Sequence, residues 1–254
     1  MSAAVRLEVR DGVGVVVIDR PEVRNAVDRP TAELVAAALD ELDARDDLRA
    51  GVLTGSGGVF SAGMDLKAFS RTGERPLTSR GGFGIVERPP ATPLIAAVEG
   101  SALGGGFEIA LACDLIVAAE DARFGLPEVT RGLVAAAGGV LRLPRRLPRN
   151  VAMEMVLLGA PVPAARLAAF GLVNRVVPPG QALDEALRLA RAVAANAPLA
   201  VRTSKFLVDR AVDWPSDEAF AHQEPHTAVV RTSADSREGA RAFVEKRPPV
   251  WTGA

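Results

Sequence analysis

Short apolar runs alternate with helical patterns over the first two thirds of the chain. Thr31–Asp43 is predicted as a helix capped by Thr31, because Leu34, Ala38 and Leu42 recur near the helical period. Parallel strands need helical crossovers, so the alternation predicts an α/β fold. Six runs rich in Val, Ile, Leu or Ala are predicted as strands: Val5–Val9, Val13–Asp19, Ala50–Thr54, Leu94–Val98, Leu115–Ala119 and Leu172–Val177.

The strand signals stop at Ala182. The change at Pro178-Pro179-Gly180 predicts two domains, a core over residues 1–180 and a helical region over residues 181–254. Residues 70–82 are polar and rich in turn formers, and they are predicted to form a mobile surface segment. Four helices are predicted after the boundary: Leu183–Ala195, Leu199–Val212, Ser216–Val230 and Ser236–Glu245.

The composition is that of a globular protein. Hydrophobic residues make up 48% of the 254 residues and charged residues 24%, which argues against disorder. A net charge of −1 gives no support to nucleic-acid or membrane binding driven by global charge. Cys113 is the single cysteine, which excludes an intrachain disulfide framework and a cysteine-rich zinc site. No signal peptide or apolar membrane span is found, so a cytoplasmic location is expected.

Several sequence motifs of known chemistry are absent. The chain has no phosphate-binding G-x-x-x-x-G-K-[ST] and no G-x-S-x-G nucleophile elbow. Gly104-Gly105-Gly106 resembles the start of a dinucleotide-binding loop, but Ile109 stands where the third glycine belongs. His222 and His226 lie four residues apart without a third ligand, so no metal site and no separate cofactor are expected.

The segment from Ala102 to Ala112 carries the first candidate chemistry. Its glycines let a ligand approach the backbone where a helix begins, and free N–H groups there can stabilise an oxyanion. Glu108 follows in the first turn of a helix that is apolar on nearly every face, so it is expected to be at least partly buried. A buried carboxylate has a raised pKa and can exchange protons near neutrality. Alternatively, Glu108 only complements the helix dipole.

A second carboxylate, Glu128, follows Pro127, which suits the first position of a helix. It too can simply complement a dipole, but two carboxylates near an oxyanion site suit acid–base chemistry next to a carbonyl group. The small residues of Phe60–Lys67 can supply another backbone N–H group or form an ordinary turn.

Taken together, these segments resemble the enoyl-CoA hydratase/isomerase (crotonase) family. The matching stretches follow one another in order over nearly the whole chain. They are Arg20–Ala26, Phe60–Lys67, Ala96–Gly106, Cys113-Asp114, Phe124–Glu128, Gly138-Gly139, Leu141–Pro144 and Phe170–Val177.

The resemblance implies a spiral of ββα turns with a helical C-terminal trimerisation region, assembled as a trimer or a dimer of trimers. It implies an acyl-CoA thioester substrate, with the amides of Met64 and Gly105 binding the thioester oxygen and Glu108 and Glu128 as the catalytic pair. Residues that match the coenzyme A-binding positions are Arg24, Ala26, Ala62, Gly63, Asp65, Leu66, Lys67 and Gly104, with Phe243 and Lys246 on a C-terminal helix that often reaches the neighbouring subunit.

The expected function is therefore addition or removal of water across the α,β double bond of an enoyl-CoA thioester. Val134–Val140 departs from the usual hydratase loop. Three stretches are similar to the carnitinyl-CoA dehydratase branch: Gly138–Pro144, Arg149–Met155 and Lys246–Trp251. Alternatives are a crotonobetainyl-CoA or carnitinyl-CoA dehydratase, an enoyl-CoA isomerase, a non-catalytic acyl-CoA binder and, more remotely, a nicotinamide-dependent oxidoreductase.

Overall fold

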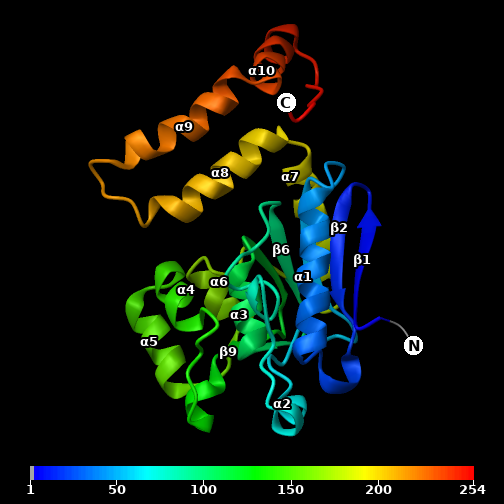
Figure 1. The fold of residues 1–254 in the computed structure, drawn as a ribbon, viewed down its shortest axis with the longest axis vertical. Helices are drawn as coiled ribbons and strands as arrows, with labels where there is room; N and C mark the ends of the chain where they lie inside the picture. Colours follow the sequence, from blue (N-terminus) through cyan, green and yellow to red (C-terminus); the bar gives the residue numbers. More distant parts are fainter. Residues whose placement is uncertain (1–2) are drawn as a thin grey trace.

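The computed structural model describes residues 3–254, and its core is built on one six-stranded sheet (Figure 1). The first two strands pair antiparallel and all other neighbours pair parallel. In spatial order the strands are β1 (Val5–Arg10), β2 (Val13–Ile18), β3 (Ala50–Gly55), β6 (Leu94–Val98), β8 (Leu115–Ala119) and β11 (Arg175–Val177).

The predicted α/β class is confirmed, and β6 and β8 have the predicted bounds. The predicted last strand, Leu172–Val177, is too long. Its first residues form a turn after Gly171, and pairing with β8 begins where the Asn174 amide donates to the Ile116 carbonyl oxygen. The Asn174 side chain also accepts a hydrogen bond from the Ile116 amide, so it fixes the start of β11.

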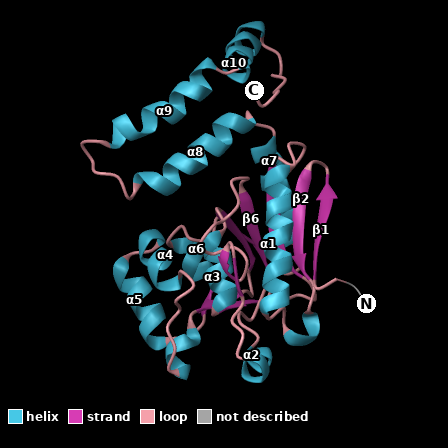
Figure 2. Ribbon diagram, viewed as in Figure 1, coloured by secondary structure: helices cyan, strands magenta, loops and turns pink. Residues whose placement is uncertain are grey.

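Helices cover both faces of this sheet (Figure 2). On one face, α7 (Ala182–Ala194) packs against the side chains of Val15, Val52 and Val117. The other face packs against α1 (Arg29–Ala44) and α3 (Gly105–Ala112) in a larger apolar cluster. Strands buried on both faces are apolar throughout, which is why β2 shows no alternation.

The cap predicted for the first helix is wrong. Asp28, rather than Thr31, is the N-cap of α1, and its carboxylate accepts hydrogen bonds from the Thr31 amide at 2.9 Å and hydroxyl at 2.6 Å. Because Pro30 suits the first turn, the helix begins two residues before Thr31.

A second, three-stranded sheet, two strands of which follow closely on strands of the first, positions the site. It contains β7 (Ser101–Leu103), β9 (Arg123–Gly125) and β10 (Val162–Pro163), in the order β10-β9-β7. The order β6-β7-α3 is a ββα unit, and β8 and β9 are followed in the same way by the short helix η2 (Pro127–Arg131). Three further helices follow: α4 (Gly139–Arg146), α5 (Arg149–Leu158) and α6 (Ala164–Ala169).

Residues 70–82 are not wholly a surface segment. They contain the end of α2 (Leu66–Thr72) and a small hairpin of β4 (Leu77–Thr78) and β5 (Gly81–Gly82). Arg80 in this hairpin is only 2% exposed, because its guanidinium pairs with Asp40 at 2.7 Å and Asp43 at 2.9 Å on α1. These ion pairs fix the hairpin to the core.

The last three helices project away from the sheet (Figure 1). These are α8 (Pro198–Ala211), α9 (Ala219–Thr232) and α10 (Ala234–Glu245), and we call residues 198–254 the C-terminal arm. The boundary predicted at residue 180 places α7 with this region, but α7 packs against the sheet, so the arm begins only after it. Within residues 3–254, no helix is long and apolar enough to cross a membrane.

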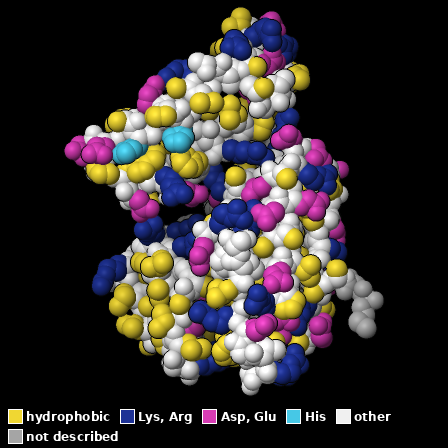
Figure 3. All heavy atoms as spheres, viewed as in Figure 1, with side chains coloured by type: hydrophobic (Ala, Val, Ile, Leu, Met, Phe, Trp, Pro, Cys, Tyr) yellow, Lys and Arg dark blue, Asp and Glu magenta, His cyan; other side chains and the backbone are white. Residues whose placement is uncertain are grey.

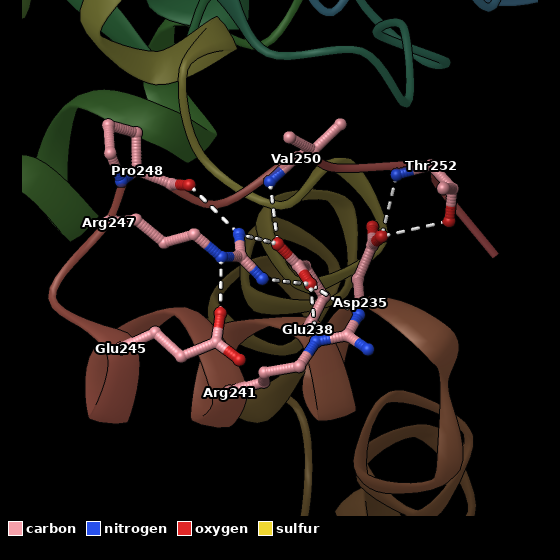
Figure 4. Close-up of polar contacts among 8 residues, drawn as sticks. All are labelled: Asp235, Glu238, Arg241, Glu245, Arg247, Pro248, Val250 and Thr252. Carbon is pink, nitrogen blue, oxygen red and sulfur yellow. Dashed lines mark hydrogen bonds and ion pairs between the residues drawn. The ribbon is translucent and has the colours of Figure 1, made fainter.

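Polar contacts hold the chain end against α10 (Figure 4). The Glu238 carboxylate accepts hydrogen bonds from Arg241 at 2.6 Å, from Arg247 at 2.6 Å and from the Val250 amide at 3.0 Å. Asp235 accepts hydrogen bonds from Thr252. Charged groups therefore fix the chain end to α10, and neither apolar cluster of buried residues includes a residue of the arm.

Candidate active site

Glu108 lies in the first turn of α3 and is almost completely buried, as its apolar neighbours predict. Its side chain is 3% exposed, and its Oε1 accepts a hydrogen bond from the Gly139 amide at 2.9 Å. Burial raises the pKa of Glu108 to about 7, the Gly139 amide opposes that rise, and the nearby Glu128 carboxylate adds to it. Glu108 can therefore hold or release a proton near neutral pH.

Glu128 faces the start of the same helix from η2. Pro127 occupies the first turn of η2, as predicted, and Glu128 follows it. A Cβ atom on Gly104 would lie 3.2 Å from Glu128 Oε1, so a side chain there would crowd this carboxylate. Glu128 Oε2 is buried and has no hydrogen-bond partner among the described residues. Burial also raises the pKa of Glu128.

The amides of Met64 and Gly105 come from two loops that touch. A Cβ on Gly63 would lie 2.6 Å from the Gly105 nitrogen, and Gly63 has a φ of 85°, so glycine is needed there for both reasons. Single β-bridges join Val27 to Met64 and Ser61 to Ala102. Within residues 3–254, neither amide donates a hydrogen bond to another protein group. Gly105 begins α3, where an unpaired N–H group is the rule.

A cavity of about 600 Å³ opens beside these groups. Phe83 forms part of its wall and packs on Gly105, where an added Cβ would lie 2.1 Å from the phenyl Cζ. Other lining residues are Met64, Arg75, Pro76, Leu77, Gly82, Val86, Glu87, Ala136, Ala137, Gly138, Leu141, Arg142 and Arg145. The volume suits a small organic group.

Some of the residues matched to coenzyme A binding lie together. The Ala62 amide donates to the Arg24 carbonyl oxygen at 3.0 Å, which joins the two stretches that contain Arg24–Ala26 and Ala62–Lys67. Leu66 and Lys67 are exposed there. Asp65 is buried, caps α2 through the Ala68 amide and lies 3.2 Å from the Arg20 guanidinium, so it shapes this loop.

Phe243 and Lys246 are not brought to this region within one chain. They lie at the end of α10, at the opposite end of the molecule from α2 (Figure 1). Phe243 is 84% exposed. A role at the same site therefore requires a second copy of the chain.

The two histidines have neighbours other than a metal. His222 stacks on Trp214 and lies 3.2 Å from the Glu218 carboxylate, and His226 lies against Phe206. Among the described residues, no three His, Cys, Asp or Glu side chains are grouped to hold a metal ion.

The model of one protein family, described as enoyl-CoA hydratase/isomerase, matches residues 8–254. The chain belongs to this family. A crystal structure of an enoyl-CoA hydratase from Mycobacterium tuberculosis is 50% identical, covers 99% of each chain and has a TM-score of 0.96. The predicted crotonase fold is confirmed by this likeness.

Two curated relatives carry names that specify an acyl group. A mevalonyl-coenzyme A hydratase of Beauveria bassiana is 43% identical over 93% of this chain and 90% of its own. A carnitinyl-CoA dehydratase of Salmonella paratyphi A is 41% identical over the full length of both chains. The similarity to the carnitinyl-CoA dehydratase branch is thus confirmed.

The sequence alone assigned no role to three residues that contribute to this site. Gly139, at the start of α4, and Phe83 reach Glu108 and Gly105 from segments that are distant in the chain. Arg142 lines the cavity from α4. Only the folded chain places these residues beside the carboxylates.

Proposed function

We propose that this chain adds water to, or removes it from, the α,β double bond of an acyl-CoA thioester, with Glu108 and Glu128 as the acid–base pair. The observation that carries the proposal is the buried Glu108 carboxylate and the half-buried Glu128 carboxylate, both with a raised pKa, beside the free amides of Met64 and Gly105. The family of the chain and the names of its relatives support hydratase and dehydratase chemistry.

In hydration, the water oxygen bonds to Cβ while one glutamate takes a proton from that water. The electron pair of the double bond moves toward the thioester oxygen, where two N–H donors stabilise the negative charge. The other glutamate delivers a proton to Cα, and the carbonyl group re-forms. Dehydration is the same sequence in reverse. Each proton goes to a named group, so no separate cofactor is needed and coenzyme A enters only as part of the substrate.

The Gly139 amide gives Glu108 a defined orientation in this scheme. Its Oε1 atom accepts that hydrogen bond, which fixes one side of the carboxylate. The buried Oε2 atom of Glu128, which has no hydrogen-bond partner among the described residues, offers a second acceptor. Buried polar atoms without partners are rare and cluster at functional sites, which supports this assignment.

The test is loss of the enoyl-thioester ultraviolet absorbance when the protein is mixed with crotonyl-CoA. We expect turnover with the wild type and a loss of about 10²–10⁴-fold with either Glu108→Gln or Glu128→Gln. Glu33→Gln, on the exposed face of α1, is the matched control and keeps full activity. Turnover that survives both site substitutions would refute the acid–base pair. Binding without any turnover would favour an isomerase or an acyl-CoA binder.

We also propose that the chain assembles as a homotrimer or a dimer of trimers and that Phe243 and Lys246 contact coenzyme A of a neighbouring copy. Large apolar side chains are exposed on the arm, including Val208 at 73% and Phe220 at 79%, and Figure 3 shows such side chains along it. Arg24, Ala26, Ala62, Gly63, Leu66, Lys67 and Gly104 would contribute within the same chain.

Light scattering tests the assembly, and the KM of crotonyl-CoA tests the contact. We expect a mass of three or six chains, which Phe220→Glu lowers. Lys246→Ala should raise the KM of crotonyl-CoA with little change in kcat. A substitution of Lys205 cannot serve as its control, because Lys205 pairs with Asp114 of the core. A monomeric wild type would rule out a contribution from a neighbour.

A further inference from the structure

The cavity beside the carboxylates has an excess of positive charge. Three arginines line it, Arg75, Arg142 and Arg145, against one carboxylate, Glu87. We infer that it takes an acyl group that ends in a carboxylate, so that the substrate class is the coenzyme A monothioester of a short dicarboxylic acid. This inference rests on the proposed acyl-CoA site and adds the chemistry of the acyl end.

Arg142 carries most of the argument because it is a half-buried cation without a counter-ion. Among the described residues, no carboxylate oxygen lies within 4 Å of its guanidinium. Its side chain donates one hydrogen bond within residues 3–254, to the Val86 carbonyl oxygen. A guanidinium has five N–H donors, so most of its capacity stays unused by the protein.

Such a group is costly to bury unless something pairs with it. Burial lowers the pKa of Arg142, which shows that the surroundings disfavour its charge. A carboxylate from a ligand would restore the pairing through two parallel N–H···O bonds, a geometry that guanidinium groups favour. The free donors lie beside Gly138 at the cavity wall, where a Cβ would lie 2.2 Å from Nη1.

The other charged groups of the lining are more exposed and matter less. Arg75 and Arg145 are exposed, and Arg145 lies 3.2 Å from Asp213 of the arm. Glu87 is exposed as well and would repel an anion weakly through solvent. Glu108 and Asp209 attract the Arg142 guanidinium and Arg146 repels it, and both carboxylates lie beyond ion-pair distance. The balance therefore favours an anion and disfavours a quaternary ammonium group.

The first test compares affinities of three saturated thioesters that cannot be hydrated. Glutaryl-CoA, butyryl-CoA and γ-trimethylammoniobutyryl-CoA share a four-carbon acyl chain and carry a carboxylate, a hydrogen or a cation at its end. Calorimetry with the wild-type protein should show glutaryl-CoA binding about tenfold more tightly than butyryl-CoA, as one charge-assisted pair predicts. The cationic thioester should bind more weakly than butyryl-CoA.

Substitution of Arg142 identifies the origin of the preference. Arg142→Gln should bring the affinities for glutaryl-CoA and butyryl-CoA to within about twofold, and Arg142→Lys should keep part of the difference. Arg188→Gln on α7 is the matched control, because that arginine is exposed and pairs with Glu185 away from the cavity. Equal affinities for all three thioesters in the wild type would overturn the inference, and this result needs no variant to fold.

Turnover of glutaconyl-CoA against crotonyl-CoA separates this inference from the proposed reaction. We expect kcat/KM about tenfold higher for glutaconyl-CoA. If glutaryl-CoA binds most tightly but neither substrate is turned over, the hydratase proposal is refuted and the inference of an anionic acyl group stands. Turnover of both substrates with equal kcat/KM, together with equal binding of the thioesters, would support the hydratase and refute the anionic acyl group.

Discussion

The core and the C-terminal arm are held together by different forces. Every residue of β2 and of α3 is buried, whereas α8 and α9 contain no buried residue. Both glutamates and the amides of Met64 and Gly105 lie in the first region, where close packing fixes the position of α3. The arm instead depends on charged contacts and exposes apolar side chains (Figure 3). Rigid packing is thus used where chemistry needs accuracy, and an open surface where another chain can bind.

The largest effect is expected from adding one carbon atom in the core. Gly106 is inside α3 with helical backbone angles, so alanine there should favour the helix. However, a Cβ would lie 2.1 Å from the Ser61 carbonyl oxygen, and the backbone cannot move away cheaply. We expect Gly106→Ala to lower the free energy of unfolding by about 3 kcal/mol or more, measured by urea denaturation. A stable Gly106→Ala protein would show that the core is less rigid than its contacts imply.

The two regions should also respond to pH with opposite sign. The folded-state pKa of Glu108 is raised from 4.5 to about 7, so folded protein binds more protons in that window and loses stability as pH rises through it. Glutamine cannot ionise. The stability of Glu108→Gln relative to the wild type should therefore increase between pH 5 and pH 8, by up to about 3 kcal/mol.

Glu238 provides the opposite case in the arm. Hydrogen bonds from Arg247 and Arg241 hold the pKa of Glu238 far below its ordinary value of 4.5 (Figure 4). Its contribution to stability is present above pH 4.5 and is lost as the medium becomes more acidic. Glu238→Gln should therefore destabilise the protein at pH 7, with a difference that narrows below pH 4.5. Parallel pH profiles for the two variants would contradict this contrast.

A smaller effect is expected where the arm is fastened to the core. Lys205 Nζ lies 2.7 Å from the Asp114 carboxylate and donates to the Pro90 carbonyl oxygen at 2.7 Å. Lys205→Met keeps the apolar stem and removes these contacts, at a cost of about 2 kcal/mol. Hydrogen exchange should accelerate in α8 and α9 but not in β6. Lys67→Met, at an exposed lysine, is the control. Equal hydrogen-exchange rates in the two variants would mean that contacts other than those of Lys205 hold the arm to the core.

The same contrast explains how much of the fold could be predicted from the sequence. Leu94–Val98 and Leu115–Ala119 have the predicted bounds. Each is an uninterrupted apolar run, so the sequence itself marks where the strand begins and ends. The two-residue and three-residue strands β4, β5, β7, β9 and β10 were not predicted, since a run that short has no periodicity. Their pairing depends on partners elsewhere in the chain.

The candidate site also has features that the sequence predicts and features that it does not. The burial of Glu108 follows from the apolar residues that surround it on one helix, and Pro127 places Glu128 at the start of η2. The Gly139 amide reaches Glu108 across 31 residues of chain, which no local pattern specifies. A ligand-binding role for Arg142 likewise follows only from the cavity that it lines in the folded chain.

The smallest effect is expected from the matched substitution in the arm. Gly239 lies inside α10, as Gly106 lies inside α3, but a Cβ there would meet only the Trp251 ring at 3.4 Å, an ordinary contact. Gly239→Ala should therefore show the helix-propensity gain alone, about 0.5–1 kcal/mol, as a small rise in Tm at fixed protein concentration. Because both substitutions add the same atom to a helix, the difference between them measures how tightly each region is packed. A fall in Tm for Gly239→Ala would contradict this expectation. Since the chain itself leaves room for the added atom, such a fall would indicate that a neighbouring copy packs closely on α10.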